Sequence, residues 1–323
     1  MPPQAVDWDG RLVRRLRLRD LHILAAVVTW GSMAQAAKHL SMSQPAVSEA
    51  IAKLEDTLHV RLLDRSPGGI APTIYANALL KRGLVVFDEL KQGVRDIEFL
   101  ADPGTGELWV GCPEFMAAGL LPAIIDRFSR HFPEVVVHAV DAPVGMMEFR
   151  ALRERKVDLM LARVPTDYLD HELDVELLFA ETFFVVAGTQ CQWARRRNVA
   201  LKDLMHERWI LHPTQILIRP LIEQAFRAHG LEVPRAKVSS VSMHVRNHLL
   251  ATGRYLTILP GTTFQFNAKR WSLTTLPIDL GIAPVPTAIV TVKNRTLSPV
   301  VQVFIEYARM IAKSLPRRYI KAV

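Results

Sequence analysis

The sequence has few of the features that mark secreted, disulfide-bonded or membrane-spanning proteins. Its two cysteines, Cys112 and Cys191, lie far apart and match no metal-ligand spacing, so we expect two reduced thiols. The most apolar stretch, residues 177–188, is interrupted by Glu181 and is shorter than the roughly 20 residues of a membrane-spanning helix. The N-terminal segment carries five arginines between residues 11 and 19 and no apolar core of signal-peptide type. These features predict a cytoplasmic protein.

The sequence also lacks the common motifs of catalytic, nucleotide-binding and metal sites. It contains no G-x-S-x-G nucleophile elbow, no Walker loop and no G-x-G-x-x-G fingerprint. His244 and His248 have the i, i+4 spacing that zinc enzymes use, but Val245 stands where an H-E-x-x-H motif has glutamate. No third ligand is placed by spacing, so we expect a solvated pair of helix histidines. The sequence therefore proposes no enzyme, no metal and no cofactor.

Composition describes a globular protein, and its net charge agrees with a polyanionic partner without establishing one. The 323 residues are enough for two or more domains with proper cores, and 50% of them are hydrophobic. The net charge is +8, but residues 1–101 hold 13 Lys and Arg against 11 Asp and Glu. Contacts with a polyanion would therefore depend on a few placed cations rather than on a strong general field.

The stretch from Gly31 to Arg65 has the pattern of two short helices joined by a tight turn. Ser32 can cap the first helix, Ser43 the second, and Pro45 falls in the first turn of the second helix, where its missing N–H costs nothing. The second helix has an apolar stripe with i, i+4, i+7 and i+11 spacing, formed by Val47, Ile51, Leu54 and Leu58.

The opposite face of this second helix has small or polar residues, namely Gln44, Pro45, Ser48, Glu49, Ala52 and Lys53. A major groove about 12 Å wide admits such a helix, and helix–turn–helix geometry places its N-terminal part against the base edges. The alternative is an ordinary antiparallel helix pair, because most such pairs do not bind DNA.

The same stretch closely resembles the signature of LysR-type transcriptional regulators. The matching residues are Gly31-Ser32, Ala36-Ala37, Leu40, Ser43-Gln44-Pro45-Ala46-Val47-Ser48, Ile51, Leu54-Glu55 and Val60-Arg61-Leu62-Leu63-Asp64-Arg65. The resemblance implies a winged helix–turn–helix over residues 12–74, with phosphate contacts from Arg65 and Thr73. Two departures are Glu49, where the family often has a basic residue, and Asn77, where it usually has glycine. The first departure puts any base code carried over from the family in doubt.

Three further segments complete the expected DNA-binding part. Residues 16–30 form an amphipathic helix, and residues 61–73 form a hairpin around a Pro-Gly-Gly tip. Residues 74–101 have a helical pattern with a heptad of Leu80, Phe87, Val94 and Ala101. The resemblance implies that residues 75–102 are a linker helix that forms a homodimer; the alternative is that the helix packs on its own domain. Residues 102–106 read as a linker.

The rest of the chain, 106–323, alternates strands and helices, which indicates an α/β domain. Predicted strands cover 107–112, 135–140, 157–162, 183–188, 209–211, 237–240, 255–259, 273–277 and 284–293. Predicted helices cover 117–131, 146–155, 218–229, 242–251 and 299–314. The order resembles the family's effector domain of the type 2 periplasmic-binding-protein class. Lobe I would hold residues 106–181 and 285–323, and lobe II residues 182–284.

Four loops at strand ends are the candidate effector site, because ligands of open α/β sheets bind beyond the carboxyl ends of strands. They contribute Glu114, Phe115, Met116, Val144, Thr214, Gln215, Ser242 and Met243, with Arg163 and Arg219 nearby. Helix amides and two arginines would suit a small organic anion. The alternative is that these are ordinary surface junctions and that both arginines pair with neighbouring acids.

Two functions follow from the sequence. The first is a LysR-type regulator that binds promoter DNA through Ser32, Ser43, Gln44, Pro45, Ser48, Glu49, Lys53, Arg65 and Thr73. A small-molecule effector between the lobes would switch it, and the family assembles as dimers and tetramers. The second is a cytoplasmic solute-binding or enzymatic α/β protein whose N-terminal helices only oligomerise.

Overall fold

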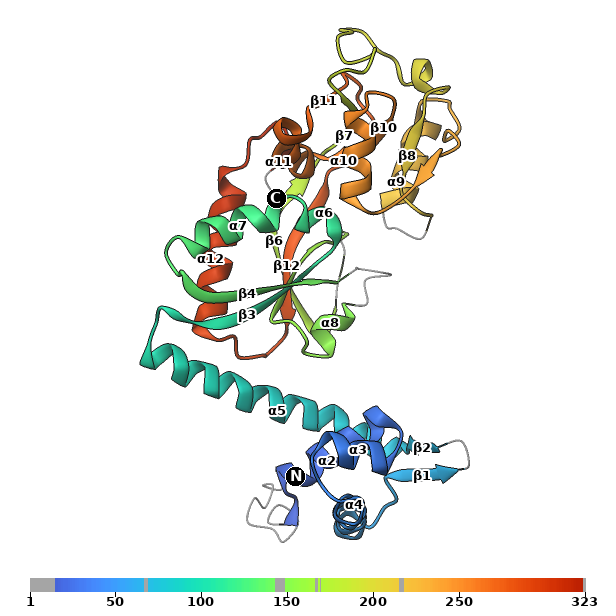
Figure 1. Ribbon diagram of the computed structural model, residues 1–323. Helices are drawn as coiled ribbons and strands as arrows, with labels where there is room; N and C mark the ends of the chain where they lie inside the picture. The colour runs from blue at the N-terminus through green and yellow to red at the C-terminus, as the bar shows by residue number, and fades with distance from the viewer. Residues whose placement is uncertain are drawn as a thin grey trace, which may run out of the picture. The chain divides into compact units, whose positions relative to one another are not determined.

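The computed structural model describes residues 15–66, 69–142, 149–165, 168, 170–214 and 218–321, without the side chains of residues 65 and 66. The chain divides into two compact units, Met1–Lys91 and Gln92–Val323, each considered by itself below (Figure 1). The predicted wing tip at residues 67–68, the loop residue Val144 and the cleft residue Gln215 lie outside the described residues.

The first unit is a three-helix core with a two-stranded wing. Its helices are α2 (Leu18–Trp30), α3 (Met33–His39) and α4 (Gln44–Leu58), and its strands are β1 (Leu63–Ser66) and β2 (Gly69–Pro72). Gly31 ends α2 in the left-handed conformation with φ 62°, and its carbonyl accepts a hydrogen bond from Ile70 of the wing. The predicted apolar stripe of α4 is buried with Leu24 and Val27 of α2 in one core.

Helix α5 (Ile74–Ala101) is a single helix of 28 residues, with the bounds that the heptad pattern predicted. Its N-terminal part belongs to the first unit, but the division between units falls inside the helix, after Lys91. Residues 92–101 therefore belong to the second unit. Several large apolar side chains of α5 are exposed, namely Leu84, Val86, Leu90, Val94, Ile97 and Leu100.

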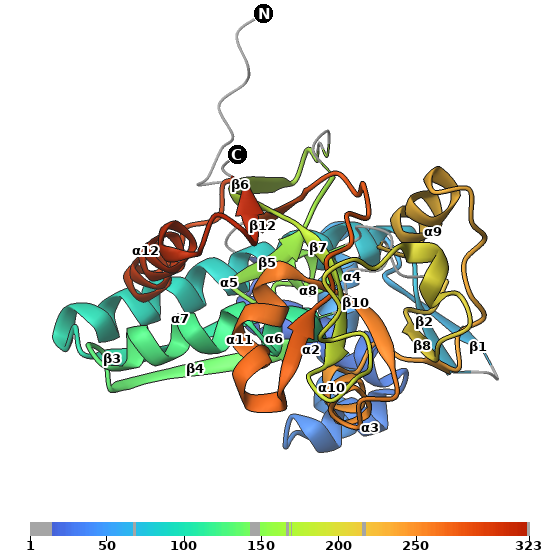
Figure 2. The same ribbon diagram turned by 90° about the horizontal axis from the view of Figure 1, so that it is seen from above.

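The second unit holds two sheets, and the first of them has six strands in the order β13-β6-β12-β5-β3-β4. Its elements are β3 (Thr105–Cys112), α6 (Glu114–Ala117), α7 (Leu120–Ser129), β4 (Glu134–Asp141), α8 (Arg150–Arg153), β5 (Leu159–Arg163), β6 (Leu173–Glu181), β12 (Val285–Val292), α12 (Pro299–Ser314) and β13 (Ile320–Lys321). Strands β4 and β5 run parallel to β3, as the βαβ pattern predicted, whereas β12 runs antiparallel to β5 and β6. Helices α7 and α12 lie side by side on one face of this sheet (Figures 1 and 2).

The second sheet has five strands in the order β11-β7-β10-β8-β9. Its elements are β7 (Phe183–Gly188), the 3-10 turn η1 (Leu201–Leu204), β8 (Trp209–Leu211), α9 (Ile218–Ala228), β9 (Val238–Ser239), α10 (Met243–Ala251), β10 (Leu256–Pro260), α11 (Gly261–Trp271) and β11 (Leu273–Thr275). Helix α9 covers one face, and α10 and α11 cover the other. The core under α10 and α11 continues into that of the first sheet, which joins the two lobes.

The structure corrects several predicted elements. Strand β6 and helix α11 were not predicted at all. The predicted helix 117–131 is two helices, because Gly119 interrupts it where the backbone of α11 approaches; a Cβ at Gly119 would lie 3.3 Å from the Cα of Thr263. Of the predicted helix 146–155, only the short α8 lies in the described residues. The predicted linker at 102–106 is a tight turn, since β3 already begins at Thr105.

The chain crosses between the sheets after β6 and again before β12. At the first crossing, Thr182 donates from its backbone N–H and its hydroxyl to the carbonyl of Tyr319, over 3.2 and 2.7 Å. At this point the lobes are therefore connected by hydrogen bonds to a backbone carbonyl as well as by the covalent chain. Among the helices in the part of the chain that the structure describes, none combines the length and apolar character needed to cross a membrane.

We predict that Gly188→Ala destabilises the second unit by about 1–3 kcal/mol, the range of other overpacking changes. A Cβ at Gly188 would lie 2.2 Å from the carbonyl oxygen of Leu250, which is backbone and cannot rotate away. The matched control is Gly93→Ala, in an exposed helical position with no atom within 4 Å, which should stabilise α5 by about 1 kcal/mol. Urea unfolding of the full chain measures both, and equal midpoints for the two variants would contradict the prediction.

Candidate DNA-binding surface and effector cleft

The sequence-predicted caps of the helix–turn–helix are formed. The Ser32 hydroxyl accepts from the N–H of Gln35 over 3.5 Å, and the Ser43 hydroxyl accepts from the N–H of Ala46 over 3.4 Å. Both hydroxyls therefore begin helices. This places Gln44 and Pro45 in the first turn of α4.

Helix α4 presents one face to the core and the other to solvent. Val47, Ile51 and Leu54 are at most 1% exposed. The opposite face holds the exposed residues Gln44, Pro45, Glu49 and Lys53, with Ser48 half-buried at its margin. In the described part of this unit, the predicted base-reading residues thus lie on an accessible helix face.

Glu55 is a structural residue of this unit that sequence reasoning treated only as part of the motif. Its Oε1 atom accepts from the N–H of Leu62 over 2.7 Å and from the N–H of Leu63 over 3.2 Å. The carboxylate of Glu55 therefore connects α4 to the start of the wing and fixes the position of the wing relative to α4.

The two residues predicted to contact phosphates, Arg65 and Thr73, lie in strand β1 and directly after strand β2 of the wing. The side chain of Arg65 lies outside the described residues, although its backbone is part of β1. The Thr73 hydroxyl donates to the carbonyl of Arg61 over 2.8 Å and accepts from the N–H of Ala76 over 3.3 Å. A hydroxyl has one proton, so Thr73 in this geometry caps α5 and cannot also donate to a phosphate.

In the second unit, two of the four predicted loops meet between the lobes. Glu114 of α6 accepts from the N–H of Met243, the first residue of α10, over 3.1 Å. The carbonyl of Phe115 accepts from the hydroxyl of Thr263 over 3.2 Å. Ser242 caps α10 by accepting from the N–H of Val245. The N-terminus of α10, which was expected to meet an effector anion, therefore holds the carboxylate of Glu114.

Arg163 lies at the end of β5, buried at 7% exposure and close to two aromatic rings. Its Cζ atom lies 3.6 Å from the ring centre of Phe115 and 5.1 Å from that of Phe183. Its Nε donates to Glu181 over 2.9 Å, whereas its Nη2 has no hydrogen-bond partner among the described residues. Burial lowers the pKa of Arg163, and Glu181 opposes that shift.

Arg219 also pairs with a neighbouring acid. Its Nε donates to Glu223 over 2.9 Å and its Nη1 donates to the carbonyl of His212 over 3.3 Å. For both arginines the structure thus shows the pairing with acids that the sequence left open as an alternative. Thr214 of the same loop is exposed, and Met116 is buried in the core of the lobes.

His212 and Arg246 are buried polar groups near the predicted effector site that the sequence pattern did not indicate. Burial lowers the pKa of His212 well below 6.5, and the positive charges of Arg246, Arg163 and Arg219 lower it further. Its Nδ1 is buried and has no partner among the described residues. Arg246 is fully buried and donates to the carbonyl of Ser240 and to the hydroxyl of Thr257. The only sequence signal was the position of His212 directly after β8.

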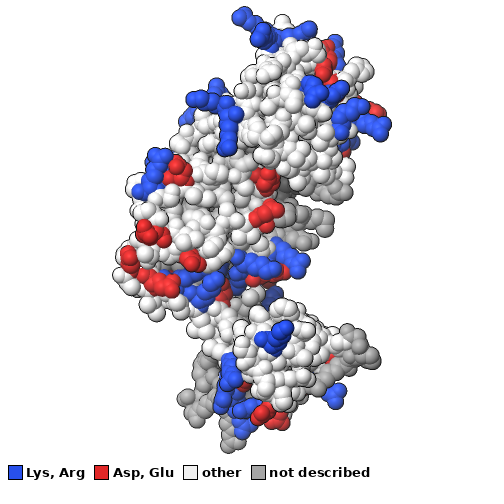
Figure 3. Space-filling model, in the orientation of Figure 1, with Lys and Arg blue, Asp and Glu red and all other residues white. Residues whose placement is uncertain are grey.

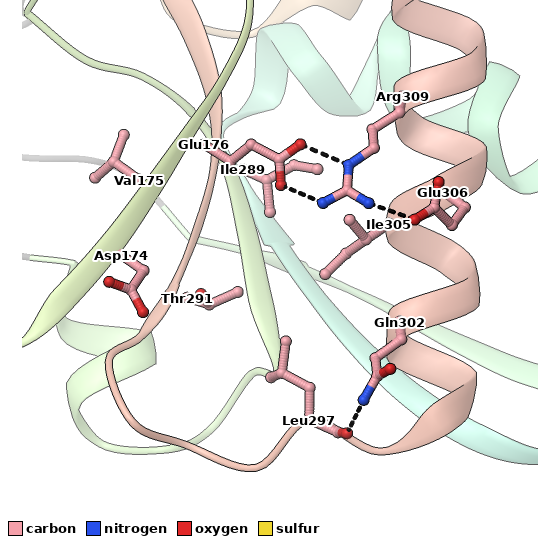
Figure 4. A pocket seen from close by; sticks show the side chains of 10 residues that line it. All are labelled: Asp174, Val175, Glu176, Ile289, Thr291, Leu297, Gln302, Ile305, Glu306 and Arg309. Carbon is pink, nitrogen blue, oxygen red and sulfur yellow. Dashed lines mark hydrogen bonds and ion pairs between the residues drawn. The ribbon is translucent and has the colours of Figure 1, made fainter.

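A different pocket lies on lobe I between α12 and strands β6 and β12 (Figure 4). Its volume is about 380 Å³, and its charged residues include Glu176, Glu306 and Arg309. Figure 4 shows the guanidinium of Arg309 held by both glutamates. Because this cation is already paired, the pocket does not offer the unpaired donors found near Arg163 and His212.

Neither histidine of α10 nor either cysteine forms a catalytic arrangement in the described residues. His244 and His248 lie 4.3 Å apart between ring centres, and the ring of Trp271 lies 4.6 Å from that of His248. Cys112 and Cys191 are buried and free. Burial and the charges of Asp141 and Glu114 raise the pKa of Cys112 to about 12, so this thiol stays protonated at neutral pH and is a poor nucleophile.

We predict that His212 makes the chain less stable in mild acid. A histidine whose folded pKa is depressed binds its proton more readily when unfolded, so stability is complete above about pH 6.5 and falls at lower pH, by at most about 1.4 kcal/mol per pH unit. In the His212→Gln variant, the melting temperature should fall less between pH 6.5 and pH 5 than it does in the parent chain. His206→Gln, at an exposed position, is the control and should leave the profile unchanged. Parallel profiles for all three chains would refute the assignment.

Two family models match the chain. The model of the LysR substrate binding domain matches residues 101–312, and that of the bacterial regulatory helix-turn-helix protein, lysR family, matches residues 18–76. Similar proteins include the HTH-type transcriptional regulator GbpR of Azospirillum brasilense, 26% identical over 93% of this chain and 87% of the relative. The transcriptional dual regulator GltC of Bacillus subtilis (strain 168) is 26% identical over 81% of this chain and 86% of its own length.

Solved structures show the same fold. A full-length single-substitution variant of OxyR from Pseudomonas aeruginosa has a TM-score of 0.63 at 18% identity, covering 95% of this chain and 98% of that one. CbnR, a LysR family transcriptional regulator, has a TM-score of 0.61 at 21% identity, covering 93% and 100%. With both of its domains matched by family models, the chain belongs to the LysR family of DNA-binding transcriptional regulators.

Proposed function

We propose that this protein reads a promoter site with the exposed face of α4 and changes its activity when a small organic anion binds between its lobes. The observation that carries the proposal is the helix–turn–helix with its polar α4 face in solvent, in a chain whose other domain matches the family's substrate-binding model. Ligand binding switches such a protein only if the ligand favours one arrangement of the lobes.

On the DNA side, Gln44, Ser48 and Glu49 are the proposed base-edge residues, and Lys53 and Arg65 the phosphate contacts. On the face shown in Figure 3, the Lys and Arg side chains of the first unit stand in separate groups on a mostly uncharged surface. This distribution agrees with the near balance of charges in residues 1–101. Specificity then rests on base contacts, with a modest electrostatic contribution from phosphates.

The exposed apolar side chains of α5 support a homodimer through this helix. Leu90, Val94, Ile97 and Leu100 are between 51% and 78% exposed, so a long helix leaves much apolar surface uncovered in a single chain. Assembly into a tetramer in the cytoplasm, as expected from the family resemblance, is part of the same proposal. CbnR, which shares the fold, has been seen in complex with its target DNA.

The unpaired donors in the cleft support an anionic effector. The Nη2 of Arg163 and the Nδ1 of His212 are both buried and without partners among the described residues. A buried donor without a partner costs about 1–3 kcal/mol, which a bound carboxylate would recover. The rings of Phe115 and Phe183, both close to Arg163, would contact an apolar part of the same ligand.

The alternative, an enzymatic or solute-binding protein whose N-terminal helices only oligomerise, has less support. The pKa of Cys112 is raised rather than lowered, and the two helix histidines pack against Trp271. A gel shift with the intergenic DNA beside its own gene, at two salt concentrations, separates the two functions. Tight ligand binding without DNA retention at any salt would favour the alternative.

We predict different losses from base and phosphate contacts. Ser48→Ala or Gln44→Ala should weaken binding to the specific site by about 1–3 kcal/mol and leave binding to random DNA almost unchanged. Arg65→Ala should weaken both and lower the salt slope by about 1. Fluorescence anisotropy at several salt concentrations measures these constants. The assignments fail if all three variants lose the same affinity on specific and random DNA.

We predict that carboxylates, rather than sugars or neutral aromatics, raise the melting temperature of the full chain. A ligand at 100 times its Kd adds about 2.7 kcal/mol to the free energy of unfolding. Arg163→Met and His212→Phe should each reduce the shift, because neither replacement side chain can donate a hydrogen bond to the anion. Arg227→Met, at an exposed position on α9, is the control. Stabilisation by neutral compounds, equal in the parent chain and the two cleft variants, would refute the proposal.

A further inference from the structure

The C-terminal part of α5 carries buried polar side chains that neither DNA binding nor the effector cleft uses. Gln92 is 2% exposed and Arg95 is 8% exposed, on a helix whose neighbouring positions Val94 and Ile97 face solvent. They meet two further buried charges of lobe I, Asp158 at 2% and Arg295 at 7%. Charged groups are rarely buried this deeply unless they are paired.

The carboxylate of Asp158 is the centre of this group. Its Oδ1 accepts from Nη1 of Arg95 over 2.9 Å and from Nη2 of Arg295 over 3.0 Å. Its Oδ2 accepts from the backbone N–H of Trp109 over 2.9 Å. Asp158 is the residue directly before β5. Its carboxylate thus connects helix α5, strand β3 and the loop after β12.

Further contacts hold both arginines in place. Nη1 of Arg295 donates to the carbonyl of Val157 over 2.9 Å. With its amide oxygen facing the guanidinium groups, Gln92 accepts from Nη1 of Arg95 over 3.2 Å and from Nη2 of Arg295 over 2.9 Å. The Cζ of Arg95 also lies 4.4 Å from the ring centre of Trp109. The interactions are numerous enough to offset part of the cost of burying these charges.

The connection beyond the helix is short and hydrogen-bonded. The side-chain carboxylate of Asp102 accepts from the N–H of Gly104 over 3.0 Å. The backbone carbonyl of Asp102 accepts from the N–H of Thr105 over 3.1 Å. Phe99, in the last turn of the helix, packs against the core of lobe I. The helix end is therefore fixed to lobe I at the turn, at Phe99 and at Arg95.

We propose that Asp158 is a joint that makes residues 92–101 of α5 part of lobe I, so that this C-terminal part of the helix follows lobe I as one body. The contacts come from α5, β3, the residues directly before β5 and the loop after β12, so this part of the helix cannot swing without breaking a buried ion pair. A change in lobe I would be passed directly to the helix that continues toward the DNA-binding unit. The joint itself requires neither the proposed effector nor the proposed DNA site.

Hydrogen–deuterium exchange of the full chain tests the joint. In the parent chain, amides in the peptide 92–101 should exchange as slowly as those of β5. Arg95→Met keeps the helix-forming stem but removes the ion pair, and should accelerate exchange in this peptide at least tenfold while α4 and β10 keep their protection. Glu98→Gln, an exposed charge change in the same turns, is the matched control and should have no effect.

Asp158→Asn places the same test on the other side of the joint, far from the helix in sequence. It should also accelerate exchange at residues 92–101, although the substitution is not on α5. If either variant loses protection throughout β3, Arg95→Lys, which keeps one charge but not the planar contacts, should show a smaller acceleration confined to 92–101. Exchange at 92–101 that is fast in the parent chain, or unchanged in the joint variants, overturns the proposal. DNA and effector binding are measured separately, so this result leaves the proposed function unaffected.

Discussion

The ion pair between Arg163 and Glu181 holds together the region where the two lobes meet. Arg163 ends β5 of lobe I, and Glu181 is the last residue before the chain crosses to lobe II. The other carboxylate oxygen of Glu181 accepts from the N–H and the hydroxyl of Thr262 at the start of α11. Both charges are almost completely buried, so loss of one partner would leave the other uncompensated. The relative placement of β5, the crossing and α11 therefore depends on this pair.

The same pair leaves one guanidinium nitrogen unused, which connects stability with function. Arg163 needs only Nε to bind Glu181, and its planar group keeps a second edge available. Strand β5, which is buried throughout, has this arginine at its end and Asp158 directly before its start. An anion at one end and the linker helix at the other would thus act on one rigid strand. This arrangement gives a short physical connection between the cleft and α5, which is the element that leads to the DNA-binding unit.

Much of the fold could be predicted where local signals were sufficient. Helices α4, α5 and α12 lie where the periodicity predicts them, and α4 begins after the predicted cap Ser43. Strand β6 alternates apolar and acidic residues only from Leu173 to Leu177 and then continues as an apolar run, so its pattern was missed. Helix α11 was missed because its first residues, Gly261-Thr262-Thr263, are poor helix formers. The N-terminus of α11 is capped by Glu181, 81 positions earlier in the chain. No local pattern contains that interaction.

The candidate site shows the same division between local and distant information. The loops that carry Glu114, Phe115 and Met243 could be selected because each follows a strand. The sequence could not predict which group binds the N-terminus of α10, because that group, the carboxylate of Glu114, lies 129 positions away in the chain. Asp158 and Glu181 behave alike: each carboxylate accepts from a backbone N–H that lies 49 or 81 positions away in the chain. A carboxylate satisfies several donors at once, so a few acidic residues can fix elements that are distant in sequence. The acidic residues that matter most to this fold are therefore those whose partners only the folded chain brings together.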